Sequence, residues 1–396
     1  MEVKPGYKHT EVGQIPEDWE VASVGSIARF TSGSGISIAN LERKSTDFPI
    51  PVFGGNGLAG YTRTPLVREK TVVIGRVGQK CGEVYITEGP AWISDNALFP
   101  KRMLRDCDVA FFGLALQAAA LNNVRNRNDL PLVTQLIVHA TRLAWPSKID
   151  EQRAIATKLR EVDALLDGLD RLIAKKRDLK QAAVQQLLTG RTRLPGFINQ
   201  WKLVRLTEIG ELLKGKGITK NQGGIGALPC IRYGELYTAH NDIIRNYHSW
   251  ISPRVASTAC LLKQGDILFA GSGETKEDIG KCAAFVDDIV AYAGGDIVIL
   301  RPHKANSTFL GYLLNTAEIS RQKTSRGQGD AIVHINTNAL ATIRFQIPNV
   351  DEQTAIAKVL TDMDAEISAL EQRREKTRAL KQAMMQELLT GKTRLI

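Results

Sequence analysis

The 396-residue sequence has little of what disulfide frameworks and metal sites require. Its five cysteines are Cys81, Cys107, Cys230, Cys260 and Cys282; none form a Cys-x-x-Cys pair, and no histidine cluster stands near them at metal-ligand spacing. The sequence therefore argues against zinc and against a disulfide-stapled fold. Scattered thiols in odd number suit a reducing compartment, where they act as small buried hydrophobic groups.

Long hydrophobic runs are also missing. No stretch approaches the roughly 18 apolar residues that a membrane-spanning helix needs, and the opening residues Met1 to Lys8 form no apolar signal core. We therefore expect a soluble protein in the cytoplasm.

Catalytic motifs are present only as fragments. Gly391-Lys-Thr393 resembles the end of a P-loop but lacks the preceding Gly-rich loop and falls at an expected helix end, so we expect no ATP site. Phe269-Ala-Gly-Ser-Gly273 resembles a methyltransferase cofactor motif, yet the sequence has no Pro-Pro dipeptide and hence no Asn/Asp-Pro-Pro-Tyr tetrapeptide; we interpret it as a turn. A Pro-Asp dipeptide, with which one class of nuclease site opens, is also absent. We expect no catalytic residues, no metal and no cofactor in this chain.

The composition is otherwise that of a folded protein with a basic surface. Hydrophobic residues make up 43% and charged residues 24%, which is ordinary globular usage. Lys and Arg outnumber Asp and Glu by 52 to 42, giving a formal charge of +10 that favours a polyanionic partner such as nucleic acid. The length predicts two or three domains.

An internal repeat defines the organisation of the chain. With a shift of 201 residues, the segment from Asp150-Glu-Gln to Thr192-Arg-Leu194 aligns with the segment from Asp351-Glu-Gln to Thr393-Arg-Leu395, with about half the positions identical. The segments upstream differ. Similar residues still recur at the same spacing at their beginnings: Trp19, Val24 and Ile27 in the first, and Trp201, Leu206 and Ile209 in the second. The order is therefore variable, repeated, variable, repeated.

Each repeated segment has the spacing of a heptad helix. We expect a helix-helix seam formed by Ile155, Leu159, Val162, Leu166 and Leu169 in the first copy and Ile356, Leu360, Met363, Ile367 and Leu370 in the second. Asp150 and Asp351 are the expected N-caps, and Gly190 and Gly391 the expected left-handed ends. A helix of roughly 38 residues is about 57 Å long, which suits a spacer, and the two copies are expected to pair antiparallel. Arg373-Arg-Glu-Lys-Thr377 interrupts the second seam.

These patterns predict an α+β fold of two mixed α/β domains separated by two long antiparallel coiled-coil helices with pseudo-twofold symmetry. The expected divisions are 1–149 for the first domain, 150–194 for the first helix, 195–350 for the second domain and 351–396 for the second helix. Within the domains, strands with tight turns are expected at 52–57, 71–75 and 296–300, where short β-branched runs meet glycines.

With these motifs, nearly the whole sequence resembles the specificity subunits of type I restriction-modification enzymes. The resemblance rests on Gly13-Gln-Ile-Pro-Glu-Asp-Trp-Glu20, the Asp-Glu-Gln helix openings and the Leu-Leu-Thr-Gly-x-Thr-Arg-Leu helix ends. It also includes Gly54-Gly-Asn-Gly-Leu-Ala-Gly-Tyr61, Val73-Ile-Gly-Arg-Val-Gly-Gln-Lys-Cys-Gly82, Gly265-Asp-Ile-Leu-Phe269 and Arg326-Gly-Gln-Gly329. One departure is Asn128-Asp-Leu-Pro-Leu-Val-Thr-Gln135, which stands where the second domain has its Gly-Gln-Gly element.

The resemblance implies that each domain is a target recognition domain for one half of a bipartite double-stranded DNA site. It implies partners as well: two methyltransferase (modification) subunits with S-adenosylmethionine, and restriction/translocase subunits with ATP and Mg. The alternatives are a self-sufficient DNA methyltransferase or endonuclease, against which the missing motifs speak, and a coiled-coil scaffold that binds only proteins.

Base edges are read by Arg or Lys against guanine and by Asn or Gln against adenine, and glycine loops let such side chains approach DNA. The candidate DNA-binding residues are Asn56, Arg76, Gln79 and Lys80 in the first domain and Lys214, Lys216, Lys220, Lys276, Arg326 and Gln328 in the second. The competing interpretation is that these glycines only make turns and the lysines only aid solubility. The basic runs at 175–177 and 373–374 fit solvated helix faces, and His139, His240, His248, His303 and His334 fit structural roles.

Overall fold

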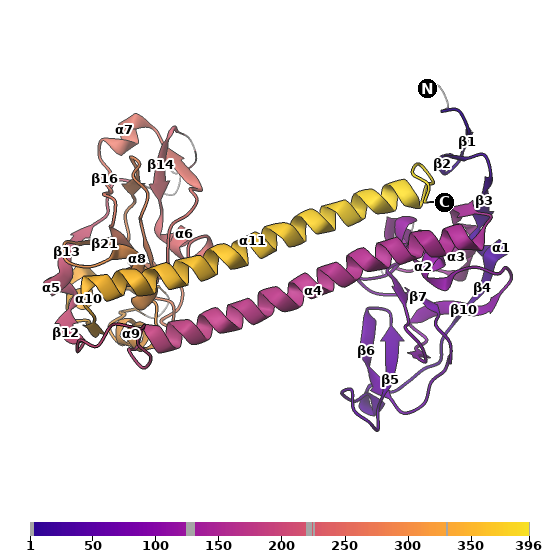
Figure 1. The fold of residues 1–396 in the computed structure, drawn as a ribbon, viewed down its shortest axis with the longest axis horizontal. Coiled ribbons are helices and arrows are strands. Elements are labelled where there is room, and N and C mark those ends of the chain that lie inside the picture. Colours follow the sequence, from indigo (N-terminus) through magenta and orange to yellow (C-terminus); the bar gives the residue numbers. More distant parts are fainter. Residues whose placement is uncertain (1–3, 124–130, 219–223, 225, 330–331, 396) are drawn as a thin grey trace. The chain divides into compact units, whose positions relative to one another are not determined.

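The structure is a computed structural model that describes residues 4–123, 131–218, 224, 226–329 and 332–395. The chain divides into two compact units, one made of Met1–Asp170 with Gln372–Ile396 and the other of Arg171–Glu371. Two 39-residue helices, α4 (Ile149–Leu187) and α11 (Val350–Leu388), each contribute one half to each unit (Figure 1). The remaining parts of the units are called here the first segment (1–149) and the second segment (195–350).

The first segment is built on an antiparallel sheet of order β4-β10-β7-β8. Its strands are β4 (Ala28–Ser32), β10 (Ala97–Met103), β7 (Val72–Gly75) and β8 (Val84–Ile86). A second sheet, β6-β5-β9, contains the hairpin of β5 (Ile50–Gly54) and β6 (Gly57–Thr62), with β9 (Trp92–Ile93) parallel to β5. The strands predicted at 52–57 and 71–75 are therefore confirmed.

Short elements complete the first segment. A hairpin joins β1 (Tyr7–Thr10) to β2 (Gly13–Pro16), and β3 (Trp19–Ser23) pairs with β11 (Arg142–Pro146). Helices α1 (Val24–Ile27), α2 (Val109–Ala118) and α3 (Gln135–Ala140) surround the main sheet, with 3-10 turns at Ile38–Asn40 and Leu121–Asn123. Phe111 and Trp145 meet edge to face at 5.4 Å in the core, because paired aromatic rings favour this geometry.

The second segment repeats the same plan. Its sheet β13-β21-β17-β19 consists of β13 (Gly210–Lys214), β21 (Ile297–Pro302), β17 (Ile267–Ala270) and β19 (Cys282–Ala284). A second sheet contains β15 (Ser249–Ile251), β14 (Leu228–Ile231), β20 (Tyr292–Ala293) and β16 (Cys260–Leu261). Strand β12 (Lys202–Arg205) pairs with β23 (Arg344–Ile347), as β3 does with β11. The strand predicted at 296–300 is confirmed as β21.

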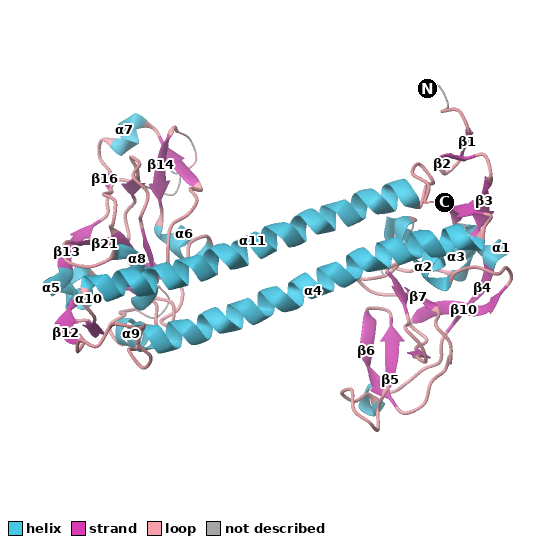
Figure 2. Cartoon of the chain, viewed as in Figure 1, coloured by secondary structure: helices cyan, strands magenta, loops and turns pink. Residues whose placement is uncertain are grey.

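The remaining helices of the second segment are α5 (Leu206–Ile209), α6 (Tyr233–Thr238), α7 (Pro253–Ala256), α8 (Ser307–Leu313), α9 (Ala317–Thr324) and α10 (Thr337–Ala341) (Figure 2). The sequence 269–273, interpreted above as a turn, bends at Gly271 and continues as β18 (Ser272–Gly273), which pairs with β22 (Val333–His334). Mixed helices and strands in two repeated segments, with two long helices, confirm the predicted α+β class.

The long helices begin and end at repeated positions. The N-cap prediction was wrong by two residues: α11 is capped by Asn349, whose side-chain oxygen accepts from the Glu352 N–H at 2.9 Å, and Asp351 lies in the first turn. Asp150 likewise lies in the first turn of α4, where a negative charge favours the helix dipole. Gly190 and Gly391 have φ of 67° and 69°, so the predicted left-handed ends are confirmed.

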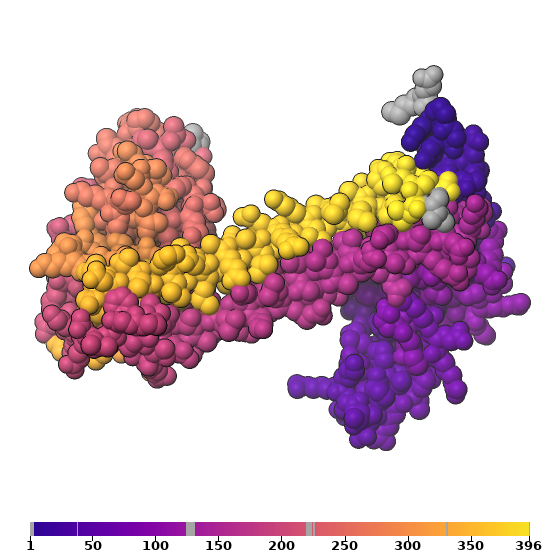
Figure 3. All heavy atoms as spheres, viewed as in Figure 1, coloured from indigo at the N-terminus to yellow at the C-terminus, as the bar shows by residue number. Residues whose placement is uncertain are grey.

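Within each unit the halves of the two helices run antiparallel and are joined by ion pairs. In the first unit Asp163 pairs with Lys381 at 2.6 Å and Asp170 with Arg374 at 3.2 Å, so residue numbers rise in one helix as they fall in the other. In the second unit Lys180 pairs with Asp364 at 2.6 Å. The 201-residue repeat aligns these two residues with Lys381 and Asp163 of the first unit. Figure 3 shows the side chains of the paired halves in contact.

The seam residues divide into two groups. Ile155 and Leu159 are buried in the core of the first segment, and Ile356 and Leu360 in that of the second. Leu169 and Ile367 are buried as well, whereas Val162, Leu166, Met363 and Leu370 are half-buried. The first turns of each long helix are thus anchored to a segment core, which heptad spacing alone did not indicate. None of the helices in the described ranges has an apolar stretch that could span a bilayer.

Candidate nucleic-acid interface

Glycines bring the ends of four strands of the first segment into close backbone contact. A Cβ atom on Gly55 would lie 2.6 Å from the carbonyl oxygen of Val77, and one on Gly75 would overlap the carbonyl oxygen of Gly55. A Cβ on Gly33 would overlap the carbonyl of Ile93 in the same way. Only a hydrogen atom fits at each of these positions, and glycine therefore allows the backbone to approach this closely. The ends of β4, β5, β7 and β9 meet at this place.

The four candidates of the first segment lie in two of the loops that follow these strands. Asn56 is exposed in the β5–β6 turn, with its side chain beside Gly78, which has a φ of 92°. Arg76 follows β7 and is half-buried; its Nη1 donates to the Ser32 hydroxyl at 2.9 Å. Gln79 and Lys80 are exposed in the same loop. The arrangement gathers amide, hydroxyl and guanidinium groups, which are the groups that read base edges and bind phosphates.

The six candidates of the second segment are more scattered. Lys214 ends β13 and is exposed, as are Lys216 and Lys276, while Lys220 lies outside the described residues. Gln328 is exposed, and its backbone bridges to His334. Arg326 is half-buried and donates to the Thr342 hydroxyl at 2.5 Å and to the Gln322 carbonyl at 2.7 Å, so it has partners within its own segment.

The two segments share one backbone framework at this place. Strand register aligns Ser32, Leu98 and Ile74 in the first segment, and Lys214, Val298 and Phe269 in the second. Two residues beyond Ile74 and Phe269, the Arg76 N–H donates to the Asn96 carbonyl at 3.0 Å and the Gly271 N–H to the Asp296 carbonyl at 2.7 Å. Arg76 therefore corresponds to Gly271, and Ser32 to Lys214.

The same framework explains the departure noted in the sequence. The Val133 N–H donates to the carbonyl of Arg76, and the Ile335 N–H donates to that of Gly271, each at 2.9 Å. Leu132, which bridges to Val77, thus corresponds to His334, which pairs with Ser272. Residues 128–130 of the departing sequence lie outside the described residues. A single backbone plan carries different side chains in the two copies.

A buried ion cluster that the sequence analysis missed explains the repeated Asp-Glu-Gln and Thr-Arg-Leu motifs. In the second unit Glu352 is 1% exposed and accepts from Arg193 Nε and Nη2 at 2.5 and 2.6 Å. In the first unit Glu151, also 1% exposed, accepts from Arg394, whose Nη2 lies 2.9 Å away, and from Trp19 Nε1 at 3.1 Å. The end of one long helix is thus tied to the beginning of the other in each unit.

The glutamine of the same motif ties each long helix to its segment. Gln152 Oε1 accepts from the Asp108 N–H at 3.0 Å and its Nε2 donates to the Pro146 carbonyl at 3.0 Å. Gln353 makes the matching bonds with Asn306 and Pro348, both at 2.8 Å. Both glutamines are buried, so these bonds satisfy polar groups that water does not reach. The repeated motif is therefore structural.

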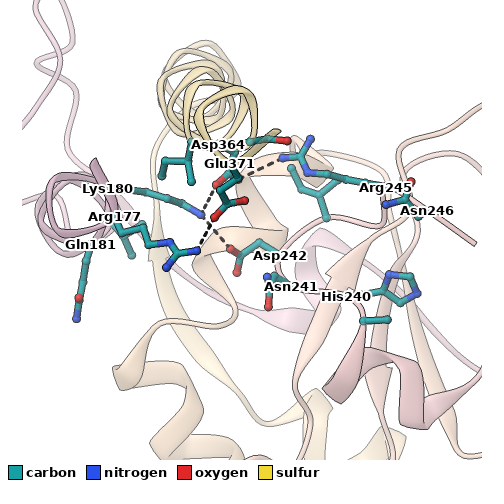
Figure 4. Close-up of a pocket in the computed structure, with 15 residues that line it drawn as sticks. Arg177, Lys180, Gln181, His240, Asn241, Asp242, Arg245, Asn246, Asp364 and Glu371 are labelled. Atoms are coloured by element: carbon teal, nitrogen blue, oxygen red, sulfur yellow. Dashed lines mark hydrogen bonds and ion pairs between the residues drawn. The ribbon is translucent and has the colours of Figure 1, made fainter. Parts of the chain in front are cut away.

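A cavity of about 510 Å³ lies within the second unit between the two helix halves and residues 239–246. Lys180 and Arg245 converge on Asp364, and Lys180 also faces Asp242 at 3.7 Å (Figure 4). Burial raises the pKa of Asp242. Because the positive and negative groups pair with one another, we interpret the cavity as a polar junction that fixes the helices on the segment.

The histidines fit structural roles where the structure shows their partners. His139 Nε2 accepts the Phe30 N–H at 3.0 Å, and burial lowers the pKa of the ring. His240 is 2% exposed, its Nε2 atom has no hydrogen-bond partner, and burial lowers its pKa to about 4. Across the described part of the chain, no group of three or more His, Cys, Asp or Glu side chains could hold a metal ion.

Comparison with known proteins identifies one family. Residues 16–175 and 198–379 match the type I restriction modification DNA specificity domain. The specificity subunit of the type I restriction enzyme MjaVIII from Methanocaldococcus jannaschii is 22% identical, covering 96% of this chain and 94% of that protein. The specificity subunit of EcoprrI from Escherichia coli is 30% identical over 37% of this chain and 36% of its own length.

Solved structures show the same fold. The S subunit of a type I restriction-modification system from M. genitalium superimposes with a TM-score of 0.65 at 14% identity, covering 98% of both chains. A chain from a structure of type I system assembly and conformational transition reaches 0.57 at 16% identity, covering 96% of this chain and 99% of its own. Since the family match spans most of the sequence in two repeated parts, the chain belongs to the type I restriction modification DNA specificity family.

Proposed function

We propose that this chain is the DNA-specificity subunit of a type I restriction-modification system, in which each segment reads one half of a bipartite DNA site. The observation that carries the proposal is the duplicated framework: Arg76 and Gly271 occupy matching positions, as do Ser32 and Lys214. A scaffold repeated with different side chains suits two readers that bind the same kind of ligand but distinguish different bases. The formal charge of +10 supports a polyanionic ligand.

The chain itself is proposed to be non-catalytic and to act in the cytoplasm. Adenine methylation with S-adenosylmethionine and DNA cleavage with ATP and Mg are assigned to partner subunits. Two modification subunits per chain fit two repeated long helices, and restriction subunits would join the same complex. The target recognition domains correspond to 1–149 and 195–350, and 150–194 and 351–396 are the spacers that set the distance between half-sites.

A salt titration of DNA binding tests the nucleic-acid part of the proposal. Neutralising phosphates releases counterions, so the affinity of the full-length chain, reconstituted with modification subunits, should fall steeply as salt rises from 50 to 200 mM. Six to ten phosphate contacts correspond to a loss of about 10³- to 10⁵-fold. No binding, or a flat response, would favour a scaffold that binds only proteins.

A methyl-transfer assay separates the proposal from a self-sufficient methyltransferase. The purified chain with labelled S-adenosylmethionine and DNA should transfer no methyl groups, and transfer should begin when modification subunits are added. Transfer by the chain alone would refute the assignment of catalysis to the partners.

A further inference from the structure

One feature of the first segment goes further than general DNA binding: the fixed orientation of Arg76. Its backbone is held on both sides, because its N–H donates to the Asn96 carbonyl and its carbonyl accepts from the Val133 N–H. The Cys81 thiol also contacts that carbonyl, at 3.1 Å. The side chain is fixed by the Ser32 hydroxyl at 2.9 Å from Nη1. The guanidinium is therefore oriented before any ligand binds.

Guanidinium chemistry narrows what such a group would recognise. A planar fork with five N–H donors matches the O6 and N7 acceptors of guanine at the major-groove edge. A bond to one Nη1 hydrogen still leaves donors for both acceptors. A lysine provides charge without the fork, and a serine or glycine provides neither. Arginine at a held position therefore favours guanine over other bases.

The second segment provides an internal comparison. At the position of Arg76 it has Gly271, which has no side chain, and at the position of Ser32 it has the exposed Lys214. The two copies thus differ in the group presented at a shared backbone position. The fold does not require an arginine at this position, since the backbone of Gly271 makes the same hydrogen bonds as that of Arg76.

The neighbourhood of Arg76 supports a reading role. Asn56 reaches the same loop from the β5–β6 turn, where its Oδ1 would lie 3.3 Å from a Cβ atom on Gly78. Ser32 and Arg76 are both half-buried, which keeps them in place and still partly accessible. Residues that are rigid and accessible are the ones that discriminate bases.

Resting on the proposed function, we propose that Arg76 reads a guanine in the half-site bound by the first segment, and that Ser32 is the positioning residue that fixes its guanidinium. The matching position of the second half-site is not read by an arginine, because Gly271 stands there. The contact therefore predicts a guanine in the half-site of the first segment and no arginine contact at the matching position of the second.

Selection from randomised duplexes tests the proposal with the full-length chain reconstituted with modification subunits. The unaltered chain should select a bipartite consensus with a guanine in one half. Arg76→Ala should lose that guanine and keep the rest of the consensus, including the whole other half. Arg76→Lys should keep affinity for DNA better than Arg76→Ala but should discriminate less than arginine. Ser32→Ala should weaken the preference without abolishing it.

A substituted base gives a second readout that does not depend on the folding of a variant. Replacing the selected guanine with 7-deazaguanine removes N7 but keeps O6. Binding by the unaltered chain should weaken, by less than the roughly 150-fold that corresponds to loss of a whole bidentate base contact. Binding by the Arg76→Ala variant should not change. A structural role alone would not produce this difference between the two chains.

The outcomes separate the inference from the proposed function. If the Arg76→Ala chain keeps the guanine, or if no guanine in either half is sensitive to 7-deaza substitution, Arg76 is not the reader and the inference is overturned. If the unaltered complex selects no consensus at all, the proposed function fails and the inference fails with it.

Discussion

We expect acid to destabilise the second unit through His240. Burial lowers its pKa to about 4, whereas an unfolded histidine titrates near 6.5. Between these values the unfolded chain binds a proton that the folded chain does not, so stability falls as pH falls. The loss between pH 7 and pH 5 should be about 2 kcal/mol.

Urea unfolding at a series of pH values measures this loss. His240→Gln should remove most of that pH dependence, because the replacement cannot be protonated in the unfolded state. His9→Asn, at an exposed position of β1, is the matched control and should behave like the unaltered chain. An equal pH dependence in the His240 variant would contradict this account.

Arg193 should stabilise the second unit through Glu352. The carboxylate is 1% exposed and its two oxygens are held by Arg193, so Arg193→Met leaves a buried charge without its partner. The free energy of unfolding should therefore fall, because Glu352 is left buried without its partner. Arg191→Met, two residues away and exposed, should cost less than about 0.5 kcal/mol. Similar urea midpoints for the two variants would show that the buried pair does not stabilise the unit.

At the residue scale the sequence indicated candidate residues but not their contacts. It did not predict that Asn56 lies beside the Arg76 loop, and the Ser32 partner of Arg76 lies 44 residues away and has no local signal. The Arg193–Glu352 pair spans 159 residues. Such pairs depend on the antiparallel register of the long helices, which heptad spacing does not specify.

Among the elements, the C-terminal glycines of the long helices should respond differently to the same substitution. Both have φ near 70°, where alanine is strained by about 1 kcal/mol. A Cβ on Gly391 would also lie 2.5 Å from Pro16 Cδ, whereas one on Gly190 would meet Trp201 at an ordinary 3.4 Å. Gly391→Ala should therefore destabilise the protein more than Gly190→Ala, and thermal unfolding measures the difference.

Gly168 is the control for these glycines. It lies inside α4, and a Cβ there would meet nothing within 4 Å. Gly168→Ala should raise stability by about 0.5–1 kcal/mol, because alanine is the better helix former. Destabilisation by this variant would indicate that α4 is strained at that position.

For the long helices, hydrophobic spacing and glycines gave better predictions than the expected N-cap residues did. The 4,3 spacing predicted both helices, and the glycines predicted their ends. The start was misplaced because the aspartates at the helix openings are good caps in isolation, while Asn349, two residues earlier, makes the capping bond. The anchoring of Ile155 and Ile356 in the segment cores could not be predicted either, since apolar spacing does not say which surface covers a residue.

At the scale of the whole molecule, the helices are proposed to act as spacers whose length fixes the distance between half-sites. Inserting one heptad of seven residues in each helix keeps the seam phase and should lengthen the gap in the recognised sequence without changing the bases read. Insertions of four residues, which break the phase, are the control and should impair recognition. An unchanged gap after the heptad insertions would rule out the spacer role.

The internal repeat allowed two long helices and two repeated domains to be predicted, because a shift of 201 residues aligns both helices and places a variable segment before each. The bases recognised could not be predicted in this way. They depend on which side chains meet a groove edge, and the shared backbone carries different side chains in the two copies, such as Ser32 and Lys214.

The most direct test of two independent readers is an exchange of one segment. Residues 195–350 would be replaced by the equivalent segment of another family member, and the DNA methylated by the reconstituted complex would be sequenced to find its modified site. The account predicts a bipartite site in which only one half has changed and the gap is kept. A site altered in both halves, or methylation without a bipartite site, would contradict it.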